Sequence, residues 1–150
     1  MDKKIDRMAL VERLEAKMGP GADVFEDNTH KSIRVSRVKL LETMRELKDN
    51  PLYEMDILMN LSSVDYPENL TVIYHLNSLR YQHHLTVKVE VSKDNPRIPS
   101  VSSIWKAAQA QEREVFDLMG IIFDGHPYLR RILLPDDFVG HPLRKDFHCS

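Results

Sequence analysis

The chain has 150 residues, enough for one domain with a sizeable core. Its composition is ordinary for a globular protein, with 42% hydrophobic and 29% charged residues, and its net charge of −2 gives no general attraction to nucleic acid or to an anionic membrane. The longest uncharged run, residues 69–79, is too short to span a membrane, and the N-terminal stretch lacks the apolar core of a signal peptide. The single cysteine, Cys149, cannot form an internal disulfide or hold an iron–sulfur cluster by itself. We therefore expect a single-domain protein of the cytoplasm.

Helical and strand periodicities alternate along most of the chain. Ser36 is placed to cap a helix, and Gly120 is placed to end one. In chain order we expect a helix at 2–18 that "GPG" ends at 19–21, short strands at 22–27 and 32–36, a helix at 37–48, a central strand within 54–66, strands at 70–79 and 83–92, a helix from Ser102 or Ser103 to about Met119, and then an irregular segment.

The segment 83–92 has the clearest alternation in the sequence. One set of alternate positions is apolar: Leu85, Val87, Val89 and Val91. The other set is polar: Thr86, Lys88 and Glu90. A strand with one apolar and one wet face is typical of antiparallel sheets, so we expect this strand to pair antiparallel.

These elements predict an α+β fold, with a mixed, mostly antiparallel sheet covered by two or three helices and an irregular, extended C-terminal tail. We expect residues 1–150 to form a single domain, with a core at about 1–120 and a C-terminal docking segment at about 121–150. A tail of that length without regular structure is uncommon in a compact domain unless it has a function, which indicates that it packs on something.

Metal binding by the tail is the first alternative, because His126, His141, His148 and Cys149 lie within 24 residues. Their spacings do not match the paired, closely spaced ligands of structural zinc sites. The neighbouring His83 and His84 lie on a strand, so their rings point to opposite faces. We expect no metal site.

The paired cations of the tail are the second alternative, as an anion or nucleic-acid site. Four cations and four carboxylates lie between residues 124 and 146 and cancel: Arg130, Arg131, Arg144 and Lys145 against Asp124, Asp136, Asp137 and Asp146. This balance indicates interlocking ion pairs, so we expect no nucleic-acid partner.

Catalysis has little support, because no nucleophile motif is visible and Cys149 stands next to the last residue. "QEREVFDL" brings carboxylates close on one helix, where Glu114 and Asp117 are three residues apart. We expect Arg113 to neutralise Asp117 at i, i+4 and this cluster to be a solvated or docking face, with no catalytic residues.

A protein interface fits the tail best, because the tail combines apolar anchors, arginines and stiffening prolines. The apolar anchors are Ile121, Ile122, Phe123, Tyr128, Leu129, Ile132, Leu133, Leu134, Phe138 and Leu143. A tail wrapped over its own sheet remains an alternative, and both arrangements are compatible.

The sequence resembles the C-type subunit of the NADH–quinone oxidoreductase of respiratory complex I, the 30 kDa subunit of the peripheral arm. The resemblance covers about residues 55–147 and includes "SSVDYP", "VIYHLNSL" and "PSVSSIWKAA". Its signature residues are Glu112, Arg113, Glu114, Asp117, Leu118, Met119, His126 and Arg130, and the closing "GHPLRKD" at 140–146 matches letter for letter. The chain departs from the family at Gln109-Ala110, where Asn-Trp is common, and at Phe138, where Trp is common.

The resemblance implies a non-catalytic scaffold subunit of a membrane-associated, proton-translocating NADH:quinone oxidoreductase. It implies docking on the D-type subunit, which is similar to the large subunit of hydrogenases, near the quinone-reducing module. Flavin, iron–sulfur clusters and quinone would then belong to partner subunits, with no cofactor bound by this chain. The complex would hold the chain peripherally on the cytoplasmic side of the cell membrane.

The docking residues that this resemblance and the composition of the tail indicate are Glu112, Arg113, Glu114, Asp117, His126, Arg130, Arg131, His141, Arg144, Lys145 and Asp146. Two alternatives stay open. One is the equivalent subunit of a membrane-bound hydrogenase or of a related dehydrogenase with another electron donor, and the other is a free-standing metal-dependent enzyme that uses the tail histidines.

Overall fold

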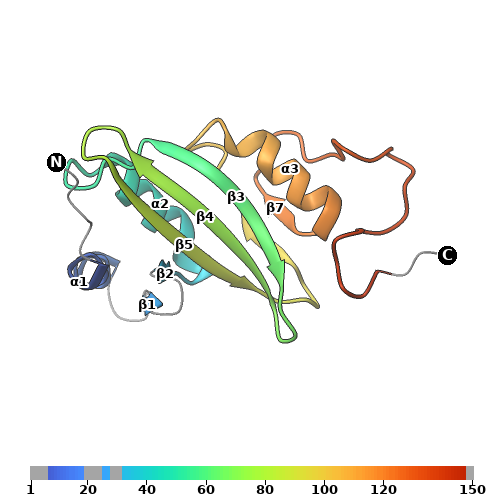
Figure 1. Ribbon diagram of the computed structural model, residues 1–150, viewed down its shortest axis with the longest axis horizontal. Coiled ribbons are helices and arrows are strands. Elements are labelled where there is room, and N and C mark those ends of the chain that lie inside the picture. The colour runs from blue at the N-terminus through green and yellow to red at the C-terminus, as the bar shows by residue number, and fades with distance from the viewer. Residues whose placement is uncertain (1–6, 19–24, 28–31, 148–150) are drawn as a thin grey trace.

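The computed structural model describes residues 7–18, 25–27 and 32–147 (Figure 1). In chain order its elements are α1 (Arg7–Met18), β1 (Phe25–Asp27), β2 (Ser32–Arg34), the 3-10 turn η1 (Arg37–Lys39), α2 (Leu40–Asp49), β3 (Ile57–Asp65), β4 (Leu70–Ser78), β5 (His83–Val91), β6 (Arg97–Pro99), α3 (Ala108–Met119) and β7 (Ile122–Asp124).

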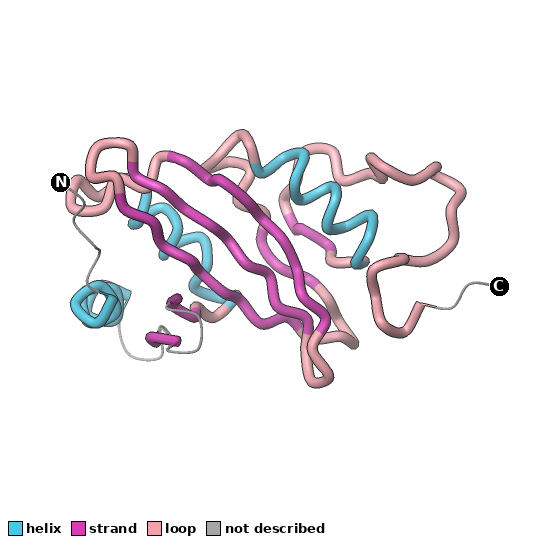
Figure 2. Tube along the Cα trace, in the orientation of Figure 1, coloured by secondary structure: helices cyan, strands magenta, loops and turns pink. Residues whose placement is uncertain are grey.

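The main sheet has the strand order β1-β2-β5-β4-β3. Its long strands β3, β4 and β5 pair antiparallel, whereas β2 joins β5 in parallel. A second, small sheet pairs β6 with β7 in parallel, which the sequence did not indicate. Figure 2 shows the long strands in front of α2, with α3 beside them and a long stretch of loop after β7. The predicted α+β class with a mixed, mostly antiparallel sheet is confirmed.

One face of the sheet forms the core together with α2, whose Leu40, Met44 and Leu47 are fully buried. The alternation predicted for β5 is confirmed on this side, since its four apolar residues are at most 1% exposed. On the other face Lys88 is only 4% exposed, contrary to the wet face expected for it. Lys88 has in-register neighbours on both sides, Arg34 of β2 and Ile73 of β4, and Arg34 forms an ion pair with Glu90 two residues further along β5.

The strand predicted to be central is an edge strand, since β3 ends the sheet order. Its apolar character reflects coverage by α3, which lies along it (Figure 1). The side chain of Gln111 in α3 accepts a hydrogen bond from the backbone N–H of Leu61 at 2.6 Å. The helix thus shields part of the edge that would otherwise present unpaired backbone groups.

The predicted start of α3 at Ser102 or Ser103 is wrong, because residues 102–107 form turns and the helix begins at Ala108. Trp105 in these turns is buried and donates its indole N–H to the carbonyl of Met55 at 3.0 Å. The predicted end is confirmed: Gly120 follows the helix in the left-handed conformation, with a φ of 75°. Ser36 also caps as predicted, but it caps the short turn η1 that precedes α2.

Some predictions fall outside the described residues. These are the start of the first helix at 2–6, the "GPG" stop at 19–21, the first half of the strand at 22–27, and residues 148–150 with His148 and Cys149. Within the described part of the chain, no helix is long and apolar enough to cross a membrane.

Candidate functional site

The segment from 125 to 147, called the tail below, runs through turns beside α3 and returns toward the end of β3 (Figure 1). Two backbone hydrogen bonds fix this return. The N–H of Leu143 donates to the carbonyl of Leu118 at 2.9 Å, and the N–H of Lys145 donates to the Asp65 carboxylate at 2.8 Å. The tail therefore packs on its own domain. This is one of the two arrangements that the sequence left open.

Asp117 of α3 organises the first half of the tail. Its carboxylate is fully buried and accepts a hydrogen bond from the Arg131 guanidinium at 2.7 Å. It also accepts the backbone N–H groups of Ile132, Leu133 and Leu134 at 3.2, 2.8 and 2.9 Å. Burial alone would raise the pKa of Asp117, but the hydrogen bonds from Arg131 and the three amides outweigh burial and lower it. Asp117 is thus a charged structural anchor for residues 131–134.

The predicted i, i+4 pair between Arg113 and Asp117 is wrong. Arg113 instead donates to the backbone carbonyls of Arg130 and Arg131, both at 3.0 Å. Arg131 takes the place beside Asp117 and donates a further hydrogen bond to the carbonyl of Gly140 at 2.7 Å. Because helical spacing indicates only local partners, it could not reveal an arginine that follows Asp117 by fourteen residues.

His141 closes the tail against the end of α3. Its Nδ1 lies 3.0 Å from the carbonyl oxygen of Asp117, and its ring packs near Phe116. Gly120 allows this approach, since a Cβ there would lie 2.7 Å from Cδ2 of His141. The histidine of the second His-Pro pair is therefore a packing residue of this junction.

Glu112 lies inside the domain, where it is fully buried. Its carboxylate accepts hydrogen bonds from the Ser100 hydroxyl at 2.5 Å and from the Val101 N–H at 2.9 Å, and Nε2 of His126 lies 4.0 Å away. Burial raises the pKa of Glu112 to about 7, although the hydrogen bonds from Ser100 and Val101 oppose the shift. The buried Tyr74 hydroxyl has its pKa raised by burial and then by the negative charge of Glu112.

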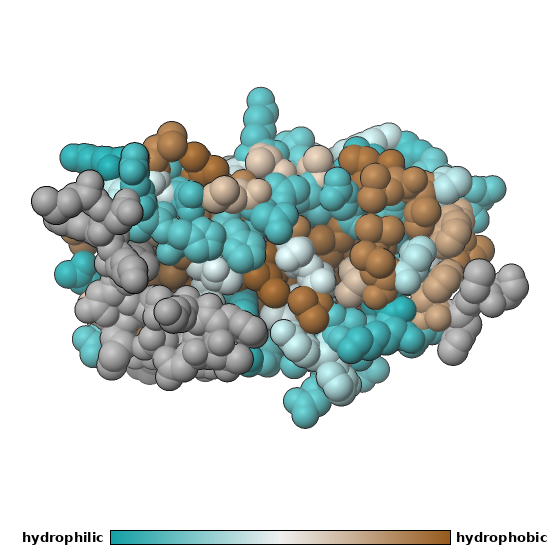
Figure 3. All heavy atoms as spheres, in the orientation of Figure 1, coloured by the Kyte–Doolittle hydropathy of each residue, from teal (hydrophilic) through white to brown (hydrophobic). Residues whose placement is uncertain are grey.

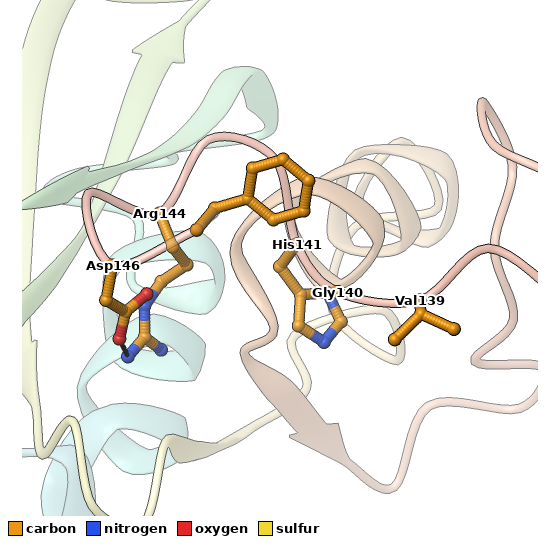
Figure 4. A pocket seen from close by; sticks show the side chains of 6 residues that line it. Val139, Gly140, His141, Arg144 and Asp146 are labelled. Carbon is orange, nitrogen blue, oxygen red and sulfur yellow. Dashed lines mark hydrogen bonds and ion pairs between the residues drawn. The ribbon is translucent and has the colours of Figure 1, made fainter. Parts of the chain in front are cut away.

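Asp65 at the end of β3 holds the last part of the tail. It pairs with Lys93 at 2.5 Å, and Nε of Arg144 lies 4.0 Å from the carboxylate. Burial opposes ionisation of Asp65, but Lys93, the Lys145 amide and Arg144 together lower its pKa. Arg144 also pairs with Asp146 at 2.9 Å, as Figure 4 shows.

The eleven residues predicted to dock a partner thus divide into two groups. Seven turn toward their own domain and are buried or half-buried: Glu112, Arg113, Asp117, His126, Arg131, His141 and Arg144. Four are exposed: Glu114, Arg130, Lys145 and Asp146. Docking through these residues stays a prediction, and the exposed group has the most accessible side chains.

The tail also exposes large apolar side chains, which we call the tail apolar set: Tyr128, Ile132, Leu133, Val139 and Leu143. Leu133 is 59% exposed and Val139 is 88% exposed. Figure 3 shows hydrophobic side chains gathered on the side of the molecule where α3 and the tail lie. Because Asp117 binds the amides of residues 132–134, Ile132 and Leu133 belong to a fixed loop.

An open pocket of about 420 Å³ lies at the end of the tail, lined by Val139, Gly140, His141, Arg144, Asp146 and Phe147 (Figure 4). Its charged groups, Arg144 and Asp146, already neutralise each other. Within the described ranges, no three or more His, Cys, Asp or Glu side chains gather to hold a metal ion.

The sequence model described as "Respiratory-chain NADH dehydrogenase, 30 Kd subunit" matches residues 33–150. The C-type subunit of the NADH-quinone oxidoreductase of Moorella thermoacetica is 45% identical over 133 residues, which are 87% of this chain and 88% of that protein.

Two solved structures resemble the fold. A trypsin-resistant fragment of Nqo5 superposes with a TM-score of 0.64 at 29% identity, over 81% of this chain and 98% of the fragment. A chain of the membrane-bound sulfane sulfur reductase, an archaeal respiratory membrane complex, superposes with a TM-score of 0.74 at 26% identity, over 94% of this chain and 85% of that chain.

Proposed function

The chain belongs to the family of 30 kDa subunits of the respiratory-chain NADH dehydrogenase, and from this we propose that it is a non-catalytic scaffold subunit of an NADH:quinone oxidoreductase. In this proposal it lies in the peripheral arm of a membrane-associated, proton-translocating complex. It docks on a D-type subunit, which resembles the large subunit of hydrogenases, near the quinone-reducing module. Flavin, iron–sulfur clusters and quinone belong to other subunits, and the complex holds the chain on the cytoplasmic side of the membrane.

The observation that carries the proposal is the tail apolar set on a fixed loop. Arg113 and Arg131 bind the backbone of the tail from within, and Asp117 binds three consecutive amides. These contacts support a loop that needs little further ordering on binding, which lowers the entropic cost of binding. Clustered apolar side chains exposed on a protein surface are characteristic of interaction sites.

The charges around this set support a protein partner. Arg130 is exposed, lies over the Tyr128 ring and pairs with Asp136 at 3.0 Å. Arginine and tyrosine at the edge of an apolar contact are enriched in protein interfaces. The balance of cations and carboxylates in the tail is also more suitable for a protein surface than for a polyanion.

A second candidate is the equivalent subunit of a related membrane complex with another electron donor. Its support is the chain of the archaeal sulfane sulfur reductase complex, which covers more of this chain than the Nqo5 fragment does. The two candidates share the docking surface and differ in the remaining subunits. Identification of the proteins that co-purify with this chain from its native membrane distinguishes them.

The docking surface is tested by co-expression of the chain with the D-type, hydrogenase-like subunit of the same organism, followed by purification through the partner. The double variant Leu133→Asp, Val139→Asp places two charges in the tail apolar set, and we expect it to weaken recovery of the pair at least tenfold, or about 1.4 kcal/mol. The matched control is Leu79→Asp, since Leu79 is similarly exposed, at 66%, but lies outside the tail in the turn between β4 and β5.

Undiminished recovery of the double variant would refute docking through the tail. Equal losses in the double variant and in Leu79→Asp would indicate a general effect of added charge. Melting curves of each variant alone show whether the domain is still folded, because surface substitutions of this kind change stability little.

A further inference from the structure

Two histidines on neighbouring strands meet on the face of the sheet that lies opposite to α2. His75 of β4 is paired in register with Thr86 of β5, and Asn77 of β4 is paired with His84 of β5. Since alternate residues of a strand share a face, all four side chains project on the same side. Figure 3 looks onto this face and shows hydrophilic side chains over these strands.

Two ring nitrogens and one hydroxyl oxygen of these side chains form a nearly equilateral triangle. Nδ1 of His75 lies 3.2 Å from Nε2 of His84. The hydroxyl oxygen of Thr86 lies 3.2 Å from the same Nε2 and 3.3 Å from the same Nδ1. Two imidazole nitrogens and one oxygen therefore converge, although the two histidines are nine residues apart in the sequence.

The distances between these three atoms match the distances between ligand atoms that surround a small metal ion. Bonds of about 2.0 Å from zinc to nitrogen and oxygen place two ligand atoms of a tetrahedral site about 3.3 Å apart. Imidazole nitrogen is a preferred ligand of Zn²⁺ and of neighbouring divalent transition metals. We propose that His75 and His84, with Thr86 at the third corner, form a surface site for a divalent transition-metal ion of the Zn²⁺ type.

Asn77 orients the site. Its side-chain oxygen lies 2.8 Å from Nδ1 of His84 and accepts a hydrogen bond from the N–H of that nitrogen. This hydrogen bond leaves the lone pair on Nε2, the nitrogen that faces His75. A partner that holds the second ring nitrogen of a ligating histidine is a regular feature of protein metal sites.

The arrangement leaves the metal open to exchange. His84 is exposed, so water completes the coordination on the outer side. The rings are stacked with centroids 5.3 Å apart, so binding of one ion requires them to rotate about their terminal torsions, which are broad for histidine. A site with two imidazoles is reversible, unlike the closed four-ligand sites that hold zinc fingers together.

The experiment uses the untagged full-length chain in a Cys149→Ser background, so that neither a tag nor the thiol supplies ligands. Isothermal titration with ZnCl₂ at about pH 7.5, where unperturbed histidines are neutral, is expected to show one Zn²⁺ per chain. His75→Asn and His84→Asn are each expected to weaken Zn²⁺ binding at least tenfold. The matched control is His83→Asn, because His83 adjoins His84 but turns to the other face, where Nε2 lies 3.3 Å from the carbonyl of Tyr53.

Proton NMR of the imidazole Cε1–H signals gives a second measurement, in which Zn²⁺ is expected to shift those of His75 and His84 and not that of His83. Absence of Zn²⁺ binding by the parent chain would overturn the proposal. So would binding that survives both His75→Asn and His84→Asn, since the ion would then lie elsewhere, for example at the tail histidines. The metal site does not depend on the proposed function. Docking is measured by co-purification without Zn²⁺, and Zn²⁺ binding is measured on the chain alone, so either result can fail without the other.

Discussion

Replacement of Asp117 by asparagine tests whether this carboxylate holds the tail on the domain. The substitution keeps the shape of the side chain but removes its charge and one of two acceptor oxygens. The wild-type carboxylate accepts four hydrogen bonds, one from the Arg131 guanidinium and three from backbone amides. The variant would also leave Arg131, only 12% exposed in its side chain, without its buried counter-charge.

The size of the effect follows from these contacts. A hydrogen bond to a charged group contributes about 1.5–3 kcal/mol and an ordinary one about 1 kcal/mol, and breaking a buried ion pair costs about 3–5 kcal/mol. Asparagine retains some of the amide contacts, so we expect a loss of about 3–5 kcal/mol in the free energy of unfolding. For a domain of this length, that corresponds to a fall of about 10 °C in Tm.

Thermal unfolding measures the global loss, and hydrogen exchange at the amides of Ile132, Leu133 and Leu134 measures the local one. The control is Glu114→Gln, an exposed carboxylate on the same helix, for which we expect a change within about 0.5 kcal/mol. If Asp117→Asn leaves both Tm and exchange at these amides as in the wild type, the carboxylate does not anchor the tail.

The effect of pH on Asp117 has a definite sign. The pKa of Asp117 is lowered in the folded state, so its contribution is present above the ordinary carboxyl pKa and is lost as pH falls through the lowered value. The difference in unfolding free energy between the wild type and Asp117→Asn should therefore shrink below about pH 4.

Two further substitutions probe the interior of the α3–tail junction. The pKa of Glu112 is raised from 4.5 to about 7, so folding favours its protonated form, and stability should fall by about 3 kcal/mol as pH rises from about 4.5 to above 7. Urea unfolding over this range should show a flatter profile for Glu112→Gln, and an unchanged profile would contradict the assignment. Gly120→Ala forces a side chain into the left-handed region and against His141, which should cost about 1–3 kcal/mol of unfolding free energy, and a Tm equal to the wild type would show that the junction yields freely.

Local patterns in the sequence identified most of the regular structure. The alternation along 83–92 predicted strand β5 and the four apolar residues that it buries, and Gly120 marked the end of α3. The ordered motifs of the second half also identified the family that the comparisons show. Each of these signals lies within a short stretch of chain, where backbone geometry is decided by neighbouring residues.

Other features depended on which distant segments meet. The apolar stretch that becomes β3 was expected at the centre of the sheet, but the cover supplied by α3 and Gln111 allows it to stand at the edge. Lys88 was expected in water and is buried, in a strand that has in-register neighbours on both sides, Arg34 of β2 and Ile73 of β4. No local pattern records these neighbours, since they arise from the order in which the strands assemble.

For this protein, the sequence by itself determined the long strands β3, β4 and β5, the end of α3, the family and the density of charge in the tail. Only the tertiary structure decided how those charges pair, with Arg131 in place of Arg113 beside Asp117, and that His75 meets His84 across two strands. The physical reason is the separation along the sequence over which each kind of interaction acts. Backbone periodicity acts over a few residues, whereas a salt bridge or a pair of ligands requires loop closure and strand register, which the whole fold establishes.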